Sequence, residues 1–145
     1  MEDGTFDALR LDNQLCFPLY ACAREVVKKY KPFLDQIDLT YTQYVTMMVL
    51  WERRQATSKE IGERLHLDSG TLTPVIKKLA EKGLVIRERA RDDERNLMVT
   101  LTQAGEALKR KAAVIPAQMG GCIHLEPEEA AALHGLLYKL LGALE

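Results

Sequence analysis

The side chains best suited to chemistry in this sequence are three cysteines, Cys16, Cys22 and Cys122. A cysteine reacts as its thiolate and can be oxidised or bridged to another thiol. Three cysteines do not make a disulfide framework, and a reducing compartment keeps such thiols free by default. A free cysteine is most often a small buried hydrophobic residue. We favour that interpretation for Cys22, which lies between two alanines.

Apolar residues from about Asp7 to Tyr30 have helical spacing, which predicts a helix that contains Cys16. Cys16 lies on the predicted inward face of this helix together with Asn13 and Tyr20. Cys22 is six residues further on, about 240° around the helix and ~9 Å along it, which is too far for a bridge. A disulfide partner for Cys16 would be Cys122 or a small free thiol. Because Cys16 is predicted well inside its helix, the helix N-terminus would stabilise its thiolate little. Tyrosine hydroxyls that donate to the thiolate could do so instead.

A metal site is not expected. The pair Cys122 and His124 is too close in sequence for a closed site, and neither His66 nor His134 has ligand partners at a useful spacing. The sequence indicates no cofactor.

The second chemically informative stretch covers residues 69–101. Leu72, Val75, Ile76 and Leu79 fall on one face of a helix whose other faces carry threonines and lysines, and Gly83 suits a left-handed C-cap. Residues 85–89 and 96–101 then alternate as two strands of a hairpin. A basic helix followed by a basic hairpin is typical of a DNA-binding unit, with the helix in the major groove and arginines on phosphates or in the minor groove. An ordinary solvated helix and hairpin is the alternative.

The preceding residues complete a helix-turn-helix. Thr40 and Gln43 form a predicted capping box that opens a buried helix to about Trp51, and Thr57 and Glu60 open a short helix that ends near His66. We expect residues 68–70 to form a tight turn into the recognition helix. Pro74 should kink the first turn of that helix or delay its start.

The flanking segments are predicted to be helices that pair two subunits. Pro32 should end or kink the first helix, Thr102 should cap a helix from about Gln103 to Val114, and Pro127 should begin the last one. The last helix carries an apolar stripe to the chain end that needs a partner, and a two-fold dimer would read two half-sites. Packing of this helix on its own subunit is the alternative.

We therefore predict a mainly α fold with a small β-hairpin wing, one domain over residues 1–145. Residues of about 40–102 would form the winged helix-turn-helix, with dimerisation helices at about 6–35 and 103–145. Residues 53–95 hold 11 basic and 8 acidic side chains, whereas the whole chain holds 20 and 21. Positive charge is thus concentrated in the predicted DNA-binding part. No apolar run is long enough to cross a bilayer and the acidic N-terminus lacks a signal peptide, so a cytoplasmic protein without membrane contact is expected.

Over nearly its whole length the sequence resembles the MarR family of winged-helix repressors, and most of all the branch that senses organic hydroperoxides, the OhrR type. The most specific pieces are LDNQLCFPLYA at 11–21, YKPFLDQIDLTYTQY at 30–44, LDSGTLTPVIKKLAEKGLVIRER at 67–89 and DERNLMVTLTQAG at 93–105. The last resembles the family's wing signature, with Asp93 and Arg95 in place.

The resemblance implies a role for each matched residue. Cys16 would be the peroxide-reactive cysteine, Tyr30 and Tyr41 would hydrogen-bond it, and Cys122 would be the resolving cysteine on the other subunit, as in two-cysteine members. One-cysteine members bridge to a cellular thiol instead. The residues expected to contact DNA are Ser69, Thr71, Thr73, Lys77, Lys78, Arg87, Arg91 and Arg95.

The implied function is a redox switch. The reduced homodimer would bind an inverted-repeat operator, and an organic hydroperoxide would release it by oxidising Cys16 to a sulfenic acid and then to a disulfide. We weigh three alternatives: a MarR-type repressor released by a small phenolic ligand, a thiol peroxidase that turns over at Cys16, and an architectural DNA binder indifferent to redox state. A full DNA-binding unit, with no evident base or oxyanion site beside the thiol, argues against an enzyme.

Overall fold

A computed structural model describes residues 4–90 and 93–145, except for the side chains of residues 90 and 93–95. The predicted DNA contacts Arg91 and the side chain of Arg95 lie outside this description. The chain forms two compact units, residues 1–115 and 116–145. The prediction of a single domain with dimerisation helices on either side of the DNA-binding part stays a prediction.

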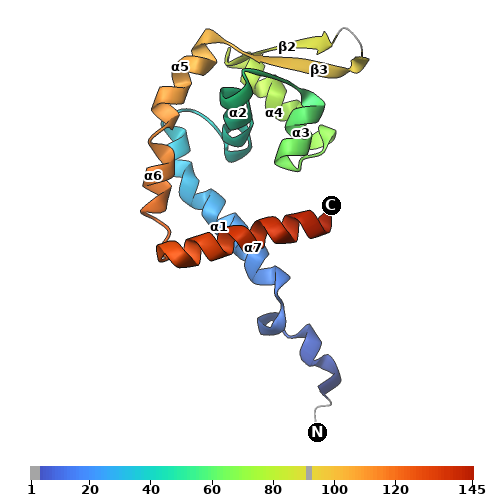
Figure 1. Cartoon of the computed structure of the whole chain (residues 1–145), viewed down its shortest axis with the longest axis vertical. Coiled ribbons are helices and arrows are strands. Elements are labelled where there is room, and N and C mark those ends of the chain that lie inside the picture. Colours follow the sequence, from blue (N-terminus) through green and yellow to red (C-terminus); the bar gives the residue numbers. More distant parts are fainter. Residues whose placement is uncertain (1–3, 91–92) are drawn as a thin grey trace. The chain divides into compact units, whose positions relative to one another are not determined.

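The first unit contains most of the secondary structure (Figure 1). Along the described residues, two short 3-10 helices come first, and α1 to α5 and three strands follow, before a short α6 and the long terminal α7. Their bounds are η1 Gly4–Leu9, η2 Leu11–Asn13, α1 Cys16–Asp35, α2 Tyr41–Arg53, β1 Gln55–Thr57, α3 Ser58–Leu65, α4 Ser69–Glu81, β2 Val85–Ala90, β3 Asp93–Leu101, α5 Gln103–Ala112, α6 Ile115–Gly120 and α7 Pro127–Leu144.

Helix α1 differs from its prediction at both ends. It starts at Cys16 rather than near Asp7, because Pro18 in its first turn lacks an N–H that would have no helical partner anyway. The residues before it form 3-10 turns instead, held by the side chain of Gln14, which donates to the carbonyl oxygens of Ala8 (2.6 Å) and Arg10 (2.9 Å). At the other end the helix continues through Pro32 to Asp35, so the expectation that it ends at Pro32 is wrong, whereas a kink there stays a prediction.

The predicted caps of the middle helices are confirmed. Thr40 and Gln43 form a complete capping box on α2, and Thr57 and Glu60 form one on α3. The predicted turn at residues 68–70 is corrected: Asp68 is the N-cap of α4, while Ser69 and Gly70 already belong to the helix. Helix α4 includes Pro74 and does not start late.

The hairpin is confirmed, and it gains a strand that the sequence did not predict. Strands β2 and β3 are antiparallel, with Val85 opposite Leu101 and Arg87 opposite Val99. The three residues of β1 pair with the other edge of β3, giving the order β1-β3-β2. This pairing joins the segment between α2 and α3 to the base of the wing. Figure 1 shows α2, α3 and α4 grouped on one side of the hairpin.

The core of the first unit lies between α2, α3, α4 and the sheet. Its side chains are at most 2% exposed at Met47, Leu50, Ile61, Leu72 and Val99. Only Leu34, near the end of α1, is buried among the residues of that helix. The helix-turn-helix and the base of the wing therefore share one core, and most of α1 lies outside it.

Helix α5 approaches the base of the wing so closely that a glycine is required. A Cβ on Gly105 would lie 2.2 Å from the carbonyl oxygen of Leu84 and 2.7 Å from Cδ1 of Leu101. The same glycine accepts a hydrogen bond of 2.9 Å from the indole N–H of Trp51 at its carbonyl oxygen. The hydrogen bond fixes α5 against α2, and the close approach to Leu84 fixes it against the start of β2. Helix α5 starts after Thr102, as predicted, but ends at Ala112 rather than Val114.

Helix α6 runs from Ile115 to Gly120, with Pro116 as its second residue. Helix α7 begins at Pro127 as predicted. None of its side chains is buried, and Leu136 and Leu144 are 64% and 74% exposed. Within the described residues, no helix is both long and apolar enough to cross a membrane.

The substitution Gly105→Ala should lower the free energy of unfolding by about 1–3 kcal/mol, because the added methyl group must displace backbone atoms. Urea unfolding followed by Trp51 fluorescence would measure this. Gly120→Ala is the matched control: no atom lies within 4 Å of its added Cβ, so its stability should be unchanged or slightly higher. Equal stabilities for the two variants would contradict the close approach.

Candidate functional site

Helix α4 presents one buried and one exposed face. Leu72, Ile76 and Leu79 are buried against the core. The predicted DNA contacts Ser69, Thr71, Thr73, Lys77 and Lys78 are all exposed. The Thr73 hydroxyl donates to the carbonyl oxygen of Ser69 (2.6 Å), and Lys78 pairs with Glu81 (3.4 Å). Such a surface of hydroxyls and ammonium groups can meet both base edges and phosphates.

The N-terminus of α4 is fixed by Asp68. A carboxylate oxygen of Asp68 accepts the backbone N–H of Thr71 at 2.7 Å. Hydrogen bonds from the Thr71 side chain and backbone lower the pKa of Asp68, so the cap is anionic at neutral pH. A negative charge there also interacts favourably with the positive end of the helix dipole.

The wing is anchored to α3 by a residue that the sequence analysis missed. The amide oxygen of Asn96 accepts the hydroxyl of Ser58 (3.0 Å) and the backbone N–H of Lys59 (3.3 Å), which lie at the start of α3. The Ser58 hydroxyl oxygen in turn accepts the backbone N–H of Leu97 (3.3 Å). Arg87 is exposed on β2. The wing and the helix-turn-helix are thus held in one orientation.

Cys16 is the first residue of α1 and is exposed within this chain. The expectation that it lies well inside its helix on an inward face is therefore wrong. The partial positive charge of a helix N-terminus acts within the first turn, so it reaches this position. Cys22 is also exposed in the single chain rather than buried as predicted.

Tyr30 and Tyr41 lie together, one near the end of α1 and the other at the start of α2. Their ring centroids are 5.0 Å apart, and Tyr44 lies 5.9 Å from Tyr30 and 6.4 Å from Tyr41. A fourth ring, Trp51, is 6.4 Å from Tyr44. Tilted rings at these distances are favourable aromatic pairs. The tyrosine cluster, defined as Tyr30, Tyr41 and Tyr44, therefore joins α1 to α2.

Burial raises the pKa of all three phenols of this cluster above the usual value of 10.0. Repulsion from Tyr41 contributes at Tyr30, and repulsion from Tyr30 and Tyr41 contributes at Tyr44. The hydroxyls consequently stay protonated at neutral pH and are available as hydrogen-bond donors.

The structure does not bring Cys16 and Tyr30 of the same chain together. They are 14 residues apart on one continuous helix. At 1.5 Å per residue the separation along the axis is about 21 Å. A hydrogen bond between these two side chains within one subunit is excluded while α1 stays helical.

Cys122 belongs to the second unit, in the turn that follows α6. It is partly exposed, and its thiol donates to the carbonyl oxygen of Gln118 (3.6 Å). Gly120 and Gly121 precede it. Among the described residues there is no group of three or more His, Cys, Asp or Glu side chains able to hold a metal ion.

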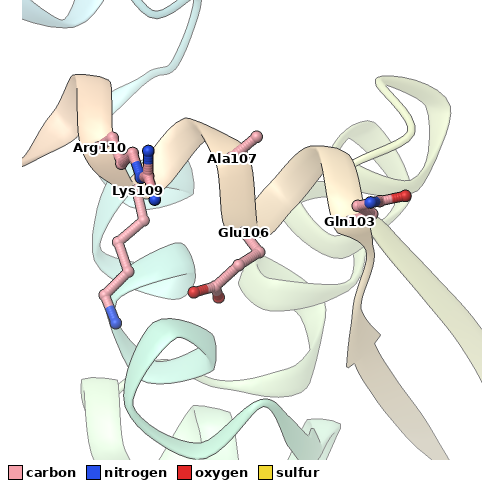
Figure 2. Close-up of a pocket in the computed structure, with 5 residues that line it drawn as sticks. All are labelled: Gln103, Glu106, Ala107, Lys109 and Arg110. Atoms are coloured by element: carbon pink, nitrogen blue, oxygen red, sulfur yellow. The ribbon is translucent and has the colours of Figure 1, made fainter.

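A shallow depression lies on α5 (Figure 2). It is lined by Gln103, Glu106, Ala107, Lys109 and Arg110, all from that single helix. Because one helix face cannot enclose a molecule, this depression offers no ligand-binding cavity.

Residues 28–112 match the family model of the transcriptional regulators SarA/Rot. The chain is 45% identical over 142 residues to the organic hydroperoxide resistance transcriptional regulator of Bacillus subtilis, covering 98% of this chain and 97% of that protein. A structure of reduced AbfR bound to DNA is similar with a TM-score of 0.80, at 35% identity over 95% of this chain and 94% of that one.

A disulfide-linked form of AbfR is similar with a TM-score of 0.60, at 34% identity over 95% of this chain and 92% of that one. A mutant of MarR from Escherichia coli, 24% identical with a TM-score of 0.68 over 88% of this chain and 96% of that one, shares the fold.

The raised phenol pKa values predict a stability that depends on pH in the alkaline range. The folded-state pKa lies above that of the unfolded chain, so this contribution is fully present below about pH 10 and is lost as pH rises through the folded pKa. We expect the free energy of unfolding of the wild type to fall more steeply above about pH 10 than that of Tyr44→Phe, which keeps the ring but not the phenol. Urea unfolding at a series of pH values measures both slopes. Tyr20→Phe, at an exposed position on α1, controls for loss of a phenol, and identical slopes for wild type and Tyr44→Phe would refute the prediction.

Proposed function

Because the chain belongs to the SarA/Rot family of transcriptional regulators and has the MarR-like winged helix-turn-helix fold, we propose that it is a redox-sensing repressor. It is a DNA-binding regulator and not an enzyme. As a homodimer it binds an inverted-repeat operator, and an organic hydroperoxide releases it by oxidising Cys16. The observation that carries the proposal is an exposed Cys16 at the start of α1, in a chain so similar to the Bacillus subtilis regulator over almost its full length.

In the proposed dimer, two sets of hydrogen-bond donors lie near the Cys16 sulfur. The backbone N–H groups of the first turn of α1 have no helical acceptors and direct positive charge at this residue. Phenols held protonated, as in the tyrosine cluster, can supply donors to the sulfur. Because Tyr30 of the same chain is about 21 Å away along α1, these donors belong to the second subunit.

A second subunit is also what the exposed apolar side chains require. Phe6, Leu9 and Leu15, before α1, are 69%, 77% and 79% exposed. Leu136, Tyr138 and Leu144 of α7 are at least 58% exposed. Exposed apolar residues gathered on terminal helices are typical of an oligomer interface. The proposed dimer buries them and brings Cys16 of each subunit to the tyrosine cluster of the other.

The oxidation proceeds in two balanced steps. The Cys16 thiolate attacks the terminal oxygen of the hydroperoxide, so that an S–O bond forms, the O–O bond breaks and the alkoxide leaves as the alcohol after taking a proton. Sulfur is oxidised by two electrons and the peroxide is reduced. A thiol then attacks the sulfenic acid, which forms an S–S bond and releases water. We propose Cys122 of the second subunit as that thiol, because Cys22 is out of reach and Cys122 is partly exposed beside two glycines.

Release follows if the oxidised dimer holds its two recognition helices at a spacing that no longer fits two half-sites. In this proposal α4 contacts bases through Ser69, Thr71 and Thr73, while Lys77, Lys78 and Arg87 contact phosphates. Arg91 and Arg95 complete the wing contacts. A differential binding free energy of about 1–3 kcal/mol between the two states is sufficient for regulation.

Operator binding by wild type, Cys16→Ser and Cys122→Ser, with and without tert-butyl hydroperoxide, tests the mechanism. The DNA is a duplex selected from a random pool by the reduced wild type. Peroxide should weaken wild-type binding at least about tenfold and leave Cys16→Ser bound. Cys122→Ser should accumulate a sulfenic acid, detected by a dimedone probe, without a disulfide-linked dimer on a non-reducing gel.

Each of the other outcomes would contradict this mechanism or indicate a different function. Release of Cys16→Ser by peroxide as readily as wild type refutes Cys16 as the sensor. Release by a phenol such as salicylate, with no response to peroxide, indicates a ligand-regulated repressor. Repeated peroxide consumption with a thiol reductant and no DNA binding indicates a thiol peroxidase, and DNA binding indifferent to peroxide in all three proteins indicates an architectural DNA binder.

Mixed dimers test whether the phenols act across the interface. One subunit carries Cys16→Ser, and the other carries both Tyr30→Phe and Tyr41→Phe. If the phenols serve the partner's thiol, the remaining Cys16 faces intact tyrosines and should react with peroxide at nearly the wild-type rate per site. If each thiol uses its own tyrosines, that Cys16 should react as slowly as in the homodimer of the double Phe variant. Stopped-flow peroxide consumption distinguishes the two rates, and the slow result would refute the cross-subunit arrangement.

A further inference from the structure

A single side chain, Lys82, joins the end of the recognition helix to the segment between α1 and α2. Lys82 is the C-cap of α4. Its ammonium donates to the backbone carbonyl of Asp38 and to the amide oxygen of Gln43 (3.2 Å), and it lies 3.5 Å from a carboxylate oxygen of Asp38. Only 28% of its side chain is exposed. The ammonium is thus held by three oxygens, none of which belongs to its own helix.

These oxygens belong to the elements that carry the tyrosine cluster. Residues 36–40 connect α1, which holds Tyr30, to α2, whose first residue is Tyr41. The amide oxygen of Gln43 also accepts the backbone N–H of Thr40 (3.1 Å), so one atom serves both the capping box of α2 and Lys82. Gln43 itself is 7% exposed. The atom that Lys82 binds is therefore hydrogen-bonded to the residue immediately before Tyr41.

The connecting segment has little freedom to absorb such a change. Ile37 and Leu39 are 8% and 5% exposed, so the residues on both sides of Asp38 are anchored in the core. Asp38 lies between them with a φ of 53°, a left-handed conformation that is costly for a residue with a side chain. Residues 37–39 are thus anchored between the ends of the two helices.

Lys82 is not needed to end or pack α4. The helix is closed by Gly83, whose N–H donates to the carbonyl of Ala80 (3.0 Å), and by the N–H of Leu84, which donates to Leu79 (3.1 Å). Its buried face is held by Leu72, Ile76 and Leu79. The link made by Lys82 is additional to these contacts, and it joins the end of α4 to the segment next to Tyr41.

We propose that Lys82 couples the tyrosine cluster to the recognition helix, so that thiol oxidation changes the orientation of α4 through Gln43 and residues 36–40. The inference rests on the proposed redox function. Lys82 is a positioning residue in this scheme: it touches neither the thiol nor the peroxide. Without it, α4 stays folded and no longer responds to the state of the cluster.

The test measures the dissociation constant for the selected duplex in the reduced state and after tert-butyl hydroperoxide, using full-length dimers with all cysteines present. The coupling ratio is the oxidised constant divided by the reduced one. Lys82→Met keeps the length of the side chain and removes the charge and donors, whereas Lys82→Arg keeps both. Lys31→Met is the matched control, because Lys31 pairs with Asp35 at 3.1 Å close to the same segment and, within the described part of the chain, forms no hydrogen bond or ion pair with α4. Titrations are made at low salt, where phosphate contacts raise the affinity of both states.

We expect a coupling ratio of at least about tenfold for wild type, Lys82→Arg and Lys31→Met, and a ratio below about threefold for Lys82→Met. Lys82→Met should be oxidised at Cys16 at the wild-type rate. A wild-type ratio near one would refute the proposed function itself. A large ratio in both wild type and Lys82→Met, whatever their absolute affinities, would refute the coupling role of Lys82 and leave the redox function intact.

A second pair of variants decides the matter if Lys82→Met fails to fold. Gln43→Met removes the acceptor of Lys82 together with one half of the α2 capping box, and Thr40→Ala removes the other half of that box without touching Lys82. If the link matters, Gln43→Met loses the coupling ratio and Thr40→Ala keeps it, although both melt at lower temperature. Equal ratios for the two would mean that Gln43 acts through helix stability alone and would overturn the proposal.

Discussion

The length of α1 is the constraint on which the proposed mechanism depends. A continuous helix of 20 residues behaves as a rod of about 30 Å, with Cys16 at its first position and Tyr30 in its last third. No rotation of side chains closes the distance between them. Any contact between this thiol and these phenols consequently requires two chains, so the reactive site and the dimer form together. The proposed dimer would also account for the exposure of Cys16 in the single chain, because the second subunit would supply its surroundings.

The parts of the fold that the sequence predicted correctly are set by local interactions. Capping boxes at Thr40 and Thr57, the cap at Thr102 and the left-handed Gly83 involve residues within a few positions of one another, and all are present. The start of α1 was missed because its apolar periodicity continues upstream of Cys16, while the signal that mattered was Pro18 in the first turn. Strand β1 was missed because three residues carry no periodicity, and only pairing with β3 makes them a strand.

In the candidate site, too, local features could be predicted from the sequence and long-range contacts could not. The exposure of the hydroxyls and lysines of α4 could be predicted because helical spacing assigns the apolar residues to one face and leaves these on the others. The ties made by Asn96 and Lys82 could not, because each joins residues about 40 positions apart and depends on the tertiary fold. The error about Cys16 follows from the wrong helix boundary: the prediction discounted the helix N-terminus at the very residue where α1 begins.

The size of the energies explains why so small a link can matter. Several fully buried side chains hold α4 in the core, and burial of each stabilises the fold by about 1.5–3 kcal/mol. We therefore expect α4 to stay packed in the oxidised dimer. Regulation, in contrast, needs only about 1–3 kcal/mol of difference between two orientations. A hydrogen bond to a charged group contributes about 1.5–3 kcal/mol when it is shielded, and less in proportion to its exposure to solvent. Lys82 is 28% exposed, but the Asp38 carboxylate is 93% exposed, so their ion pair adds at most about 1 kcal/mol. A link of this size biases an orientation without determining the fold. In a DNA-binding protein with two states, we expect the two states to differ in interactions of this strength rather than in the packing of the core.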